Sequence, residues 1–175
     1  MARQSTVSVN RQTEIVAAAI EVFAELGYYR ATTAKVAERA QISQPYVFKF
    51  FATKELLLLA ALKASWARVE ESFSQVIETV SSERLEQELI SAYAQIMHEH
   101  RNEILLQMQA QTITDAPIVE VMREGFNQVR SMVYDSFVKA GIAQPAERTM
   151  LFLARGMLCN ISMSLDMPEL MKIED

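Results

Sequence analysis

Apolar side chains recur at intervals of about 3.6 residues along nearly the whole chain, a period that gives a helix one buried face. Ile15, Ala19 and Phe23 form one such stripe. Gly27 and Gly141 directly follow apolar stretches, as helix-ending glycines do, and the four prolines lie just inside the starts of others. No segment alternates apolar and polar residues as a half-buried strand does. The sequence therefore predicts an all-α fold.

About eight or nine helices are expected, and eight can be placed by their apolar period and end residues. Thr32, Ser43 and Thr53 are the expected N-caps of the second, third and fourth helices. Because Pro45 has no N–H, the Ser43 side chain should accept a hydrogen bond from the amide of Tyr46. The expected helices cover residues 10–26, 33–40, 44–50, 53–80, 83–99, 102–113, 116–140 and 145–166.

The composition excludes several classes of protein. Half of the residues are apolar and 22% are charged, which is typical of a globular chain and not of a disordered one. A single cysteine, Cys159, excludes an internal disulfide and a multi-cysteine metal site. The longest apolar run, residues 56–62, is too short for a bilayer, and residues 1–12 lack the apolar core of a secretory signal. We therefore expect a cytoplasmic protein.

Charge is distributed unevenly along the chain. Residues 1–60 carry seven Lys or Arg against five Glu, whereas the remainder carries ten against seventeen acidic residues. A mildly basic first third on an acidic chain suits a nucleic-acid-binding segment joined to a body that does not bind nucleic acid. Chance variation in a short segment explains the same numbers equally well. Charge alone does not decide between the two.

The short helices at 33–40 and 44–50, joined by a turn of three residues, have the spacing of a helix-turn-helix motif. In this motif the second helix enters the major groove and the first holds it there. The positions expected to face inward are apolar and partly small: Val36, Ala37, Ala40, Ile42 and Val47. The exposed end of the second helix would then carry Gln44, Pro45, Tyr46 and Lys49, where such helices meet base edges. The spacing favours a DNA-binding protein over a generic helical hairpin.

The segment from Phe23 to Leu57 resembles the N-terminal domain of TetR-family transcriptional regulators. The family pattern is a Phe, a Gly-Tyr pair, a Thr-Thr pair, a helix of small residues, a Ser, the recognition helix and Lys-Glu-x-Leu. The matching residues are Phe23, Gly27, Tyr28, Thr32, Thr33, Ser43, Lys54, Glu55 and Leu57. The resemblance implies a homodimeric repressor that binds a palindromic DNA operator and is released by a small apolar or amphipathic ligand.

The resemblance also implies two domains and a set of DNA contacts. Residues 1–52 would form a three-helix, helix-turn-helix domain, and residues 53–175 a helical domain for ligand binding and dimerisation. Thr33 and Lys54 match phosphate-contacting positions of the family, while Gln44, Pro45 and Tyr46 match positions that contact bases and backbone. The full set expected at the DNA is Thr32, Thr33, Lys35, Ser43, Gln44, Pro45, Tyr46, Phe48, Lys49, Phe50 and Lys54.

Three residues depart from the family pattern. Phe48 stands where a phosphate-bonding Tyr is common, and Phe50 where Tyr or His is usual, so two polar contacts are absent. Gln41 replaces the usual turn glycine, which costs roughly 1 kcal/mol if the turn still needs a positive φ. These departures place more of the expected affinity on Lys49, Lys54 and backbone amides.

The last two long helices carry more apolar residues than one thin helical body can cover, which indicates a dimeric bundle. The expected dimer interface comprises Val129, Val133, Phe137, Leu151, Ala154, Leu158 and Ile161. Soft methionine and aromatic side chains on the surrounding helices form either a plain core or an apolar ligand pocket. The candidate pocket residues are Trp66, Tyr93, Met97, Met108, Met122, Phe126 and Phe152. The helix that begins at Thr53 is the expected link between pocket and DNA.

The alternative is a helical enzyme or adaptor that merely contains the hairpin. That function would need a convergent set of acid, base or metal-binding residues, and the sequence offers none. The run His98-Glu99-His100 lacks the spacing of a metal-binding helix motif and indicates a solvated helix end. We therefore expect no catalytic residue, no metal and no cofactor.

Overall fold

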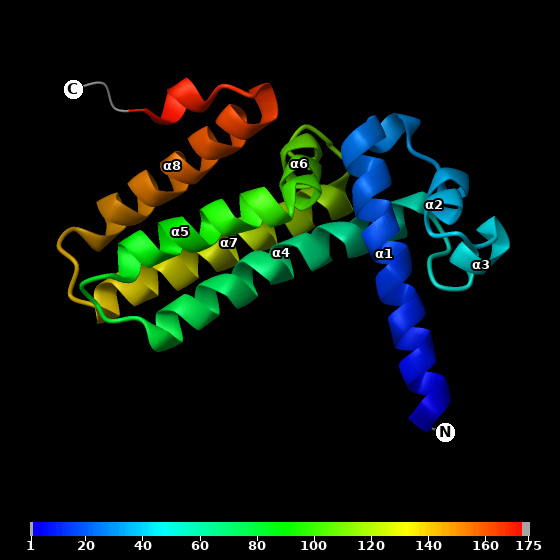
Figure 1. Cartoon of the computed structure of the whole chain (residues 1–175), viewed down its shortest axis with the longest axis horizontal. Coiled ribbons are helices and arrows are strands. Elements are labelled where there is room, and N and C mark those ends of the chain that lie inside the picture. Colours follow the sequence, from blue (N-terminus) through cyan, green and yellow to red (C-terminus); the bar gives the residue numbers. More distant parts are fainter. Residues whose placement is uncertain (1, 173–175) are drawn as a thin grey trace. The chain divides into compact units, whose positions relative to one another are not determined.

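The computed structural model describes residues 2–172, with side chains from residue 10 onward. Eight α-helices and one short 3-10 helix follow one another along the described chain, without a strand (Figure 1). The elements are α1 (Ala2–Arg30), α2 (Thr33–Arg39), α3 (Gln44–Phe48), α4 (Lys54–Thr79), α5 (Leu85–Glu99), α6 (Arg101–Ala110), α7 (Ala116–Lys139), α8 (Pro145–Leu165) and η1 (Pro168–Met171). The all-α prediction is confirmed.

Most helix ends lie where the sequence predicts them. Gly27 interrupts α1 with φ 73° and ψ 160°, which is the expected end of the regular first helix. Thr32 caps α2 by accepting a hydrogen bond from the Lys35 amide, and Thr53 caps α4 by accepting one from the Leu56 amide. These caps use side-chain oxygens to satisfy amides that have no partner within the helix.

Three details differ from the prediction. Helix α1 begins at Ala2, well before residue 10. Ser43 precedes α3 but makes no side-chain cap, because the Tyr46 amide donates to the backbone carbonyl of Ser43 at 2.9 Å instead. The helix η1 was not expected, although Pro168 at its start is a typical first helical residue.

The chain falls into two compact units. Unit 1 contains the residues up to Ser65 together with Leu106–Met122, and unit 2 contains Trp66–Leu105 and the residues from Arg123 onward. Unit 1 is therefore larger than the predicted 1–52 domain, since it includes the first half of α4, the end of α6 and the start of α7. The helices α4, α6 and α7 each run from one unit into the other, whereas the sequence indicated only the first of these links.

Unit 1 has its own apolar core. Helix α1 packs on α2, and α2 packs on α3 (Figure 1). The predicted stripe of α1 is buried, with Phe23 and Ala19 fully so. The first turns of α4 add Leu57, Leu58 and Leu62 to the buried residues of this unit. Burial of these faces fixes the short helices α2 and α3, which would not be stable in isolation.

Unit 2 is held together by aromatic side chains. Phe73 of α4 lies edge-on to both Tyr93 of α5 and Phe152 of α8, and Phe152 in turn lies edge-on to Phe137 of α7. Trp66 packs edge-on against Phe126 with a centroid separation of 4.9 Å. Such pairs contribute about 0.5–1.5 kcal/mol each beyond the burial of their area.

The structure corrects part of the predicted dimer interface. Val129, Val133 and Phe137 of α7 are buried within the protomer, so they offer no surface to a partner, and the prediction for these three is wrong. Their apolar face is covered by unit 2 itself. The other predicted residues, Leu151, Ala154, Leu158 and Ile161, are exposed on α8.

No helix within residues 2–172 is long and apolar enough to cross a bilayer.

Candidate nucleic-acid interface

The pair α2 and α3 is fixed by a small buried core and a tight turn. Val36, Ala37 and Val47 are buried, as predicted, whereas Ala40 and Ile42 are half-buried. The turn between the helices is closed by a hydrogen bond from the Ile42 amide to the Ala37 carbonyl at 2.9 Å.

Gln41 in this turn has a φ of 55°. The turn therefore keeps the left-handed conformation that glycine usually supplies, and the expected conformational cost of Gln41 applies.

Helix α3 presents a mixed polar and aromatic surface. Gln44, Pro45 and Lys49 are exposed, and Phe48 is 45% exposed although it is large and apolar. Such a face can offer an amide, a cation and an apolar side chain to a groove, and these groups match base edges, phosphates and thymine methyls respectively.

Two predicted residues of this surface are less available than expected. Tyr46 and Phe50 are half-buried, and their rings pack edge-on at 5.5 Å. The Nζ of Lys49 lies 5.2 Å from the centroid of the Tyr46 ring, a cation–π distance. The aromatic pair therefore also shapes α3 and orients Lys49.

Gln44 and Thr33 interact with each other. The Nε2 of Gln44 donates to Oγ1 of Thr33 at 2.9 Å, so the first residue of α3 is tied to the first residue of α2. Thr33 is only 8% exposed. Its side chain therefore positions Gln44 in the free protein, and a phosphate contact of Thr33 remains a prediction.

Lys54 is engaged inside unit 1. Its Nζ donates to the carbonyl oxygens of Tyr28 at 2.8 Å and of Ala31 at 3.2 Å, and it lies 4.4 Å from the centroid of the Tyr28 ring. Burial is the main factor that raises the pKa of the Tyr28 hydroxyl. Lys54 thus holds the start of α4 against the end of α1. This role was not predicted, because nothing local in the sequence joins residues 28 and 54.

The cations of the interface fall into two groups. Arg39 is bound to Glu21 at 2.6 Å and to Glu25 at 2.7 Å, both on α1, and its hydrogen bond lowers the pKa of the Glu25 carboxyl. Lys35 and Lys49 are exposed and make no ion pair within residues 10–172. Arg39 therefore fixes α2 on α1, while these two lysines are free to meet phosphates.

The structure also shows an exposed residue and a contact that the sequence did not predict. Tyr29 at the end of α1 is 79% exposed, which is unusual for a large aromatic residue. Gln109 of α6 donates from Nε2 to the carbonyl of Ala24 on α1 at 2.7 Å, while its buried Oε1 has no partner among the described residues. The partners lie 85 positions apart, so no local sequence signal could reveal them.

The predicted pocket residues do not form one site. Met108 and Met122 belong to unit 1, whereas the other five belong to unit 2. Within unit 2, Trp66, Phe126, Tyr93 and Phe152 pack in aromatic pairs. A cavity of about 430 Å³ lies between α5, α8 and η1, and of the seven predicted residues it includes Phe152 alone. Aromatic residues at helical spacing thus mainly build the core here.

Within the described chain, no three His, Cys, Asp or Glu side chains gather in a group that could hold a metal ion. Tyr93 donates to Oδ1 of Asn160 at 2.9 Å, and burial is the main factor that raises its pKa to about 12. The buried Tyr93–Asn160 hydrogen bond belongs to the packed interior of unit 2.

The N-terminal part of the chain is similar to a known family. Residues 15–61 match the family model described as "Bacterial regulatory proteins, tetR family". One relative is the HTH-type transcriptional regulator HbdR of Aromatoleum sp. (strain CIB), with 24% identity over 81% of this chain and 63% of that protein. Another is the HTH-type transcriptional activator FasR of Mycolicibacterium smegmatis, with 31% identity over 42% of this chain and 34% of that protein. The matches thus span less than two thirds of these relatives.

A solved structure with a similar fold is the transcriptional regulator FadR from Bacillus subtilis in complex with stearoyl-CoA. Its TM-score is 0.73 at 18% identity, and the match covers 88% of each chain. At this identity the likeness concerns the fold, which is that of an N-terminal helix-turn-helix joined to a helical body.

Proposed function

We propose that the chain is a transcriptional regulator of the TetR family and that it represses transcription as a homodimer bound to a palindromic operator. Repression is the simplest outcome, since a dimer seated on an operator blocks other proteins from that DNA. The observation that carries the proposal is the exposed face of α3, where Gln44 and Pro45 lie in the first turn and Lys49 directly follows the last residue, outside a buried helix-turn-helix core. The protein would act in the cytoplasm.

The proposed DNA surface combines positioning and recognition. Lys35 and Lys49 supply cations that no carboxylate within residues 10–172 neutralises. Phosphate contacts of this kind set the register of a protein on DNA, and base contacts from α3 then provide specificity. The Gln44 amide would have to exchange its bond with Thr33 for one with a base edge, or keep it and present its carbonyl oxygen.

The proposed dimer contact is the exposed stripe of α8. Its members alternate at spacings of three and four residues, as in the seam between two helices that pack side by side. They are Leu151, Ala154, Leu158, Ile161 and Leu165, and four of them are large apolar residues exposed by 40–61%. A second copy of the chain would cover this stripe. Two copies of α3 must then lie about 34–36 Å apart to enter successive major grooves.

The proposed effector is a small apolar or amphipathic molecule that binds unit 2 and releases DNA. Three continuous helices connect the units, and Gln109 on α6 bonds to α1 inside unit 1. A ligand can change DNA affinity only if it binds the two states of the protein differently. DNA must then weaken ligand binding by the same factor.

Fluorescence anisotropy with a labelled DNA fragment from upstream of the protein's own gene tests this function. The wild-type protein should bind that fragment at least 1,000-fold more tightly, on the order expected for specific sites, than a scrambled fragment. Lys49→Gln should weaken binding and reduce the dependence of log K on log salt by about one.

A matched control is Lys63→Gln, which removes an exposed lysine from α4 in the same unit and should leave binding unchanged. Equal binding of both fragments by the wild-type protein, or equal losses in the two variants, would contradict the assigned surface.

A further inference from the structure

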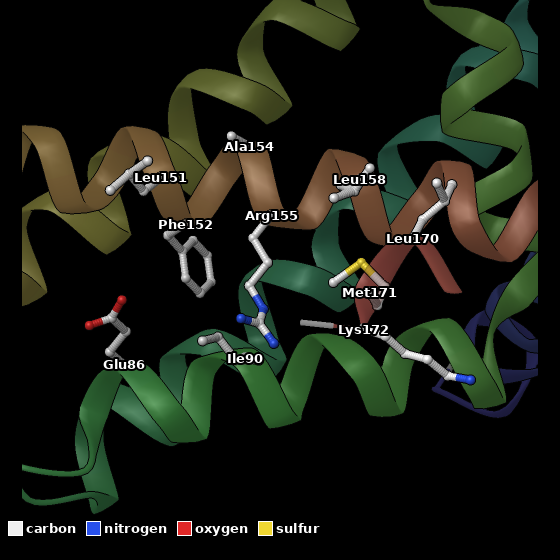
Figure 2. Close-up of a pocket in the computed structure, with 10 residues that line it drawn as sticks. All are labelled: Glu86, Ile90, Leu151, Phe152, Ala154, Arg155, Leu158, Leu170, Met171 and Lys172. Carbon is white, nitrogen blue, oxygen red and sulfur yellow. The ribbon is translucent and has the colours of Figure 1, made fainter. Parts of the chain in front are cut away.

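The cavity between α5, α8 and η1 has the size of a ligand site. Its volume is about 430 Å³, within the range of about 300–1,000 Å³ common for small-molecule sites. Figure 2 shows helices α5 and α8 on opposite sides of it, with the side chains of η1 at one end. All of its lining residues belong to unit 2.

One part of the cavity wall is apolar. Ile90 of α5, Phe152 of α8, and Leu170 and Met171 of η1 line it (Figure 2). None of these four residues is fully exposed, so each combines protein packing with a face toward the cavity. A hydrocarbon chain placed against them would remove its own apolar surface and that of the wall from contact with water, which is favourable.

The charges at the cavity are predominantly positive. Arg155 and Lys172 line it, and neither makes an ion pair within the described residues. The single acidic lining residue, Glu86, is already paired with Arg148. In Figure 2 the Arg155 side chain extends from α8 toward α5 and ends beside Ile90, whereas the Lys172 ammonium lies at the margin. The guanidinium is therefore a free, planar donor set next to an apolar wall.

We infer that this cavity binds an amphipathic anion, with a carboxylate head on Arg155 and a hydrocarbon tail along Ile90, Phe152 and Met171. A guanidinium matches a carboxylate through two parallel hydrogen bonds, which a neutral head cannot reproduce. A cationic head would face two like charges. The site thus selects ligands by the charge of the head group as well as by the hydrocarbon tail. It differs from the pocket expected from the sequence.

The inference deepens the proposed function, because it names the chemical class and the place of the effector. It rests on that function only for the consequence to DNA, since binding itself is measured on the protein without DNA. The cavity borders the proposed dimer seam, and Leu151, Ala154 and Leu158 belong to both. The residues chosen for the test, Arg155 and Ile90, lie outside the seam.

Isothermal titration calorimetry with three probes of equal chain length tests the site: decanoate, decan-1-ol and decyltrimethylammonium. All three are used below their micelle-forming concentrations on the full chain. The wild-type protein should bind decanoate at least about tenfold more tightly than decanol, because a charge-assisted bond is lost with the neutral head. The cationic probe should bind more weakly still.

Two variants separate the head from the tail. Arg155→Gln should reduce decanoate affinity about tenfold and leave decanol affinity unchanged. Ile90→Trp should reduce the affinity for both probes by filling the cavity. The matched control Arg130→Gln removes an exposed arginine of α7 that does not line the cavity, and it should change neither affinity.

Absence of decanoate binding by the wild-type protein would overturn the inference, and so would equal affinity for the three probes. Equal losses with Arg155→Gln for decanoate and decanol would overturn the role of the guanidinium. Circular dichroism of each variant, compared with the wild type, identifies any loss that results from misfolding. Failure of the DNA experiment above leaves these binding results unaffected, so the two failures are distinguishable.

Discussion

Replacement of Gly125 by alanine should destabilise the protein, although alanine is the better helix former. Gly125 lies in the interior of α7, where a Gly→Ala change normally gains up to about 1 kcal/mol. A Cβ atom built at this position would overlap the middle of the Trp66 ring, at Cγ, Cδ2 and Cε2. The absence of a side chain at Gly125 therefore allows the indole to approach the backbone of α7 closely.

The size of the loss follows from how little the indole can move. Trp66 is 6% exposed, and the ring of Phe126 packs against the indole with a centroid separation of 4.9 Å. Overpacking of a well-packed core costs roughly 1–3 kcal/mol and occasionally more. Because the added Cβ would lie well within 3.0 Å of atoms of the Trp66 ring, the upper part of this range applies, about 2–3 kcal/mol. Subtraction of a helix-propensity gain of about 1 kcal/mol leaves an expected net loss of about 1–2 kcal/mol for Gly125→Ala.

Gly156 provides a matched control within the same unit. It also lies inside a helix, α8, but a Cβ there would meet Tyr93 at 3.6 Å, an ordinary van der Waals distance. Gly156→Ala should therefore stabilise the protein by about 0.5–1 kcal/mol through helix propensity alone. The two substitutions are chemically identical, yet they should change stability in opposite directions.

Thermal unfolding at one fixed protomer concentration measures the difference. For a chain of this size, 1 kcal/mol corresponds to about 2–4 °C, so the two variants should differ by on the order of 5–10 °C. Trp66 is the single tryptophan of the chain, so its fluorescence reports directly on the disturbed contact. A melting temperature of Gly125→Ala at or above that of Gly156→Ala would contradict the proposed overlap with Trp66.

Three further predictions concern the interface, the assembly and the interior. Lys54→Ala should lower the free energy of unfolding by about 1–3 kcal/mol, because the carbonyls of Tyr28 and Ala31 lose a charged donor. It should also weaken DNA binding at all sequences. An unchanged free energy of unfolding in urea would contradict the structural role of Lys54. Leu158→Asp should convert the proposed dimer into monomers, as measured by light scattering, since a charge in an apolar seam is costly. A stable dimer of this variant would place the interface elsewhere. Tyr93 has its pKa raised from 10.0 to about 12, so between these values the unfolded chain loses a proton that the folded chain keeps, and stability should fall as pH rises through this range. Tyr93→Phe should remove that part of the alkaline loss, and an identical pH profile in urea unfolding would contradict it.

Most helices and their ends follow from the local sequence. Gly27, Thr32 and Thr53 act within one or two helical turns, so the residues that end or cap a helix are visible in the local order of the chain. The helix-turn-helix could be predicted for the same reason, because its spacing and small residues lie in one continuous segment. For Gln41 the sequence set only a condition, that the turn keeps a positive φ, and the structure meets it with a φ of 55°.

The packing of the helices settles which chain covers each apolar face and which partner each polar group binds. A 3.6-residue period marks a face to be buried, but it does not say whether the same chain or a second copy buries it. Val133 and Leu158 have similar patterns, yet the first is buried in the protomer and the second is exposed.

The same limit applies to single polar groups. The Nζ of Lys54 bonds to carbonyls 23 and 26 positions away, and the amide of Gln109 to one 85 positions away. Packing alone brings such partners together. The cavity beside Arg155 likewise depends on where α5, α8 and η1 meet, because a cavity is space that three separate segments leave unfilled.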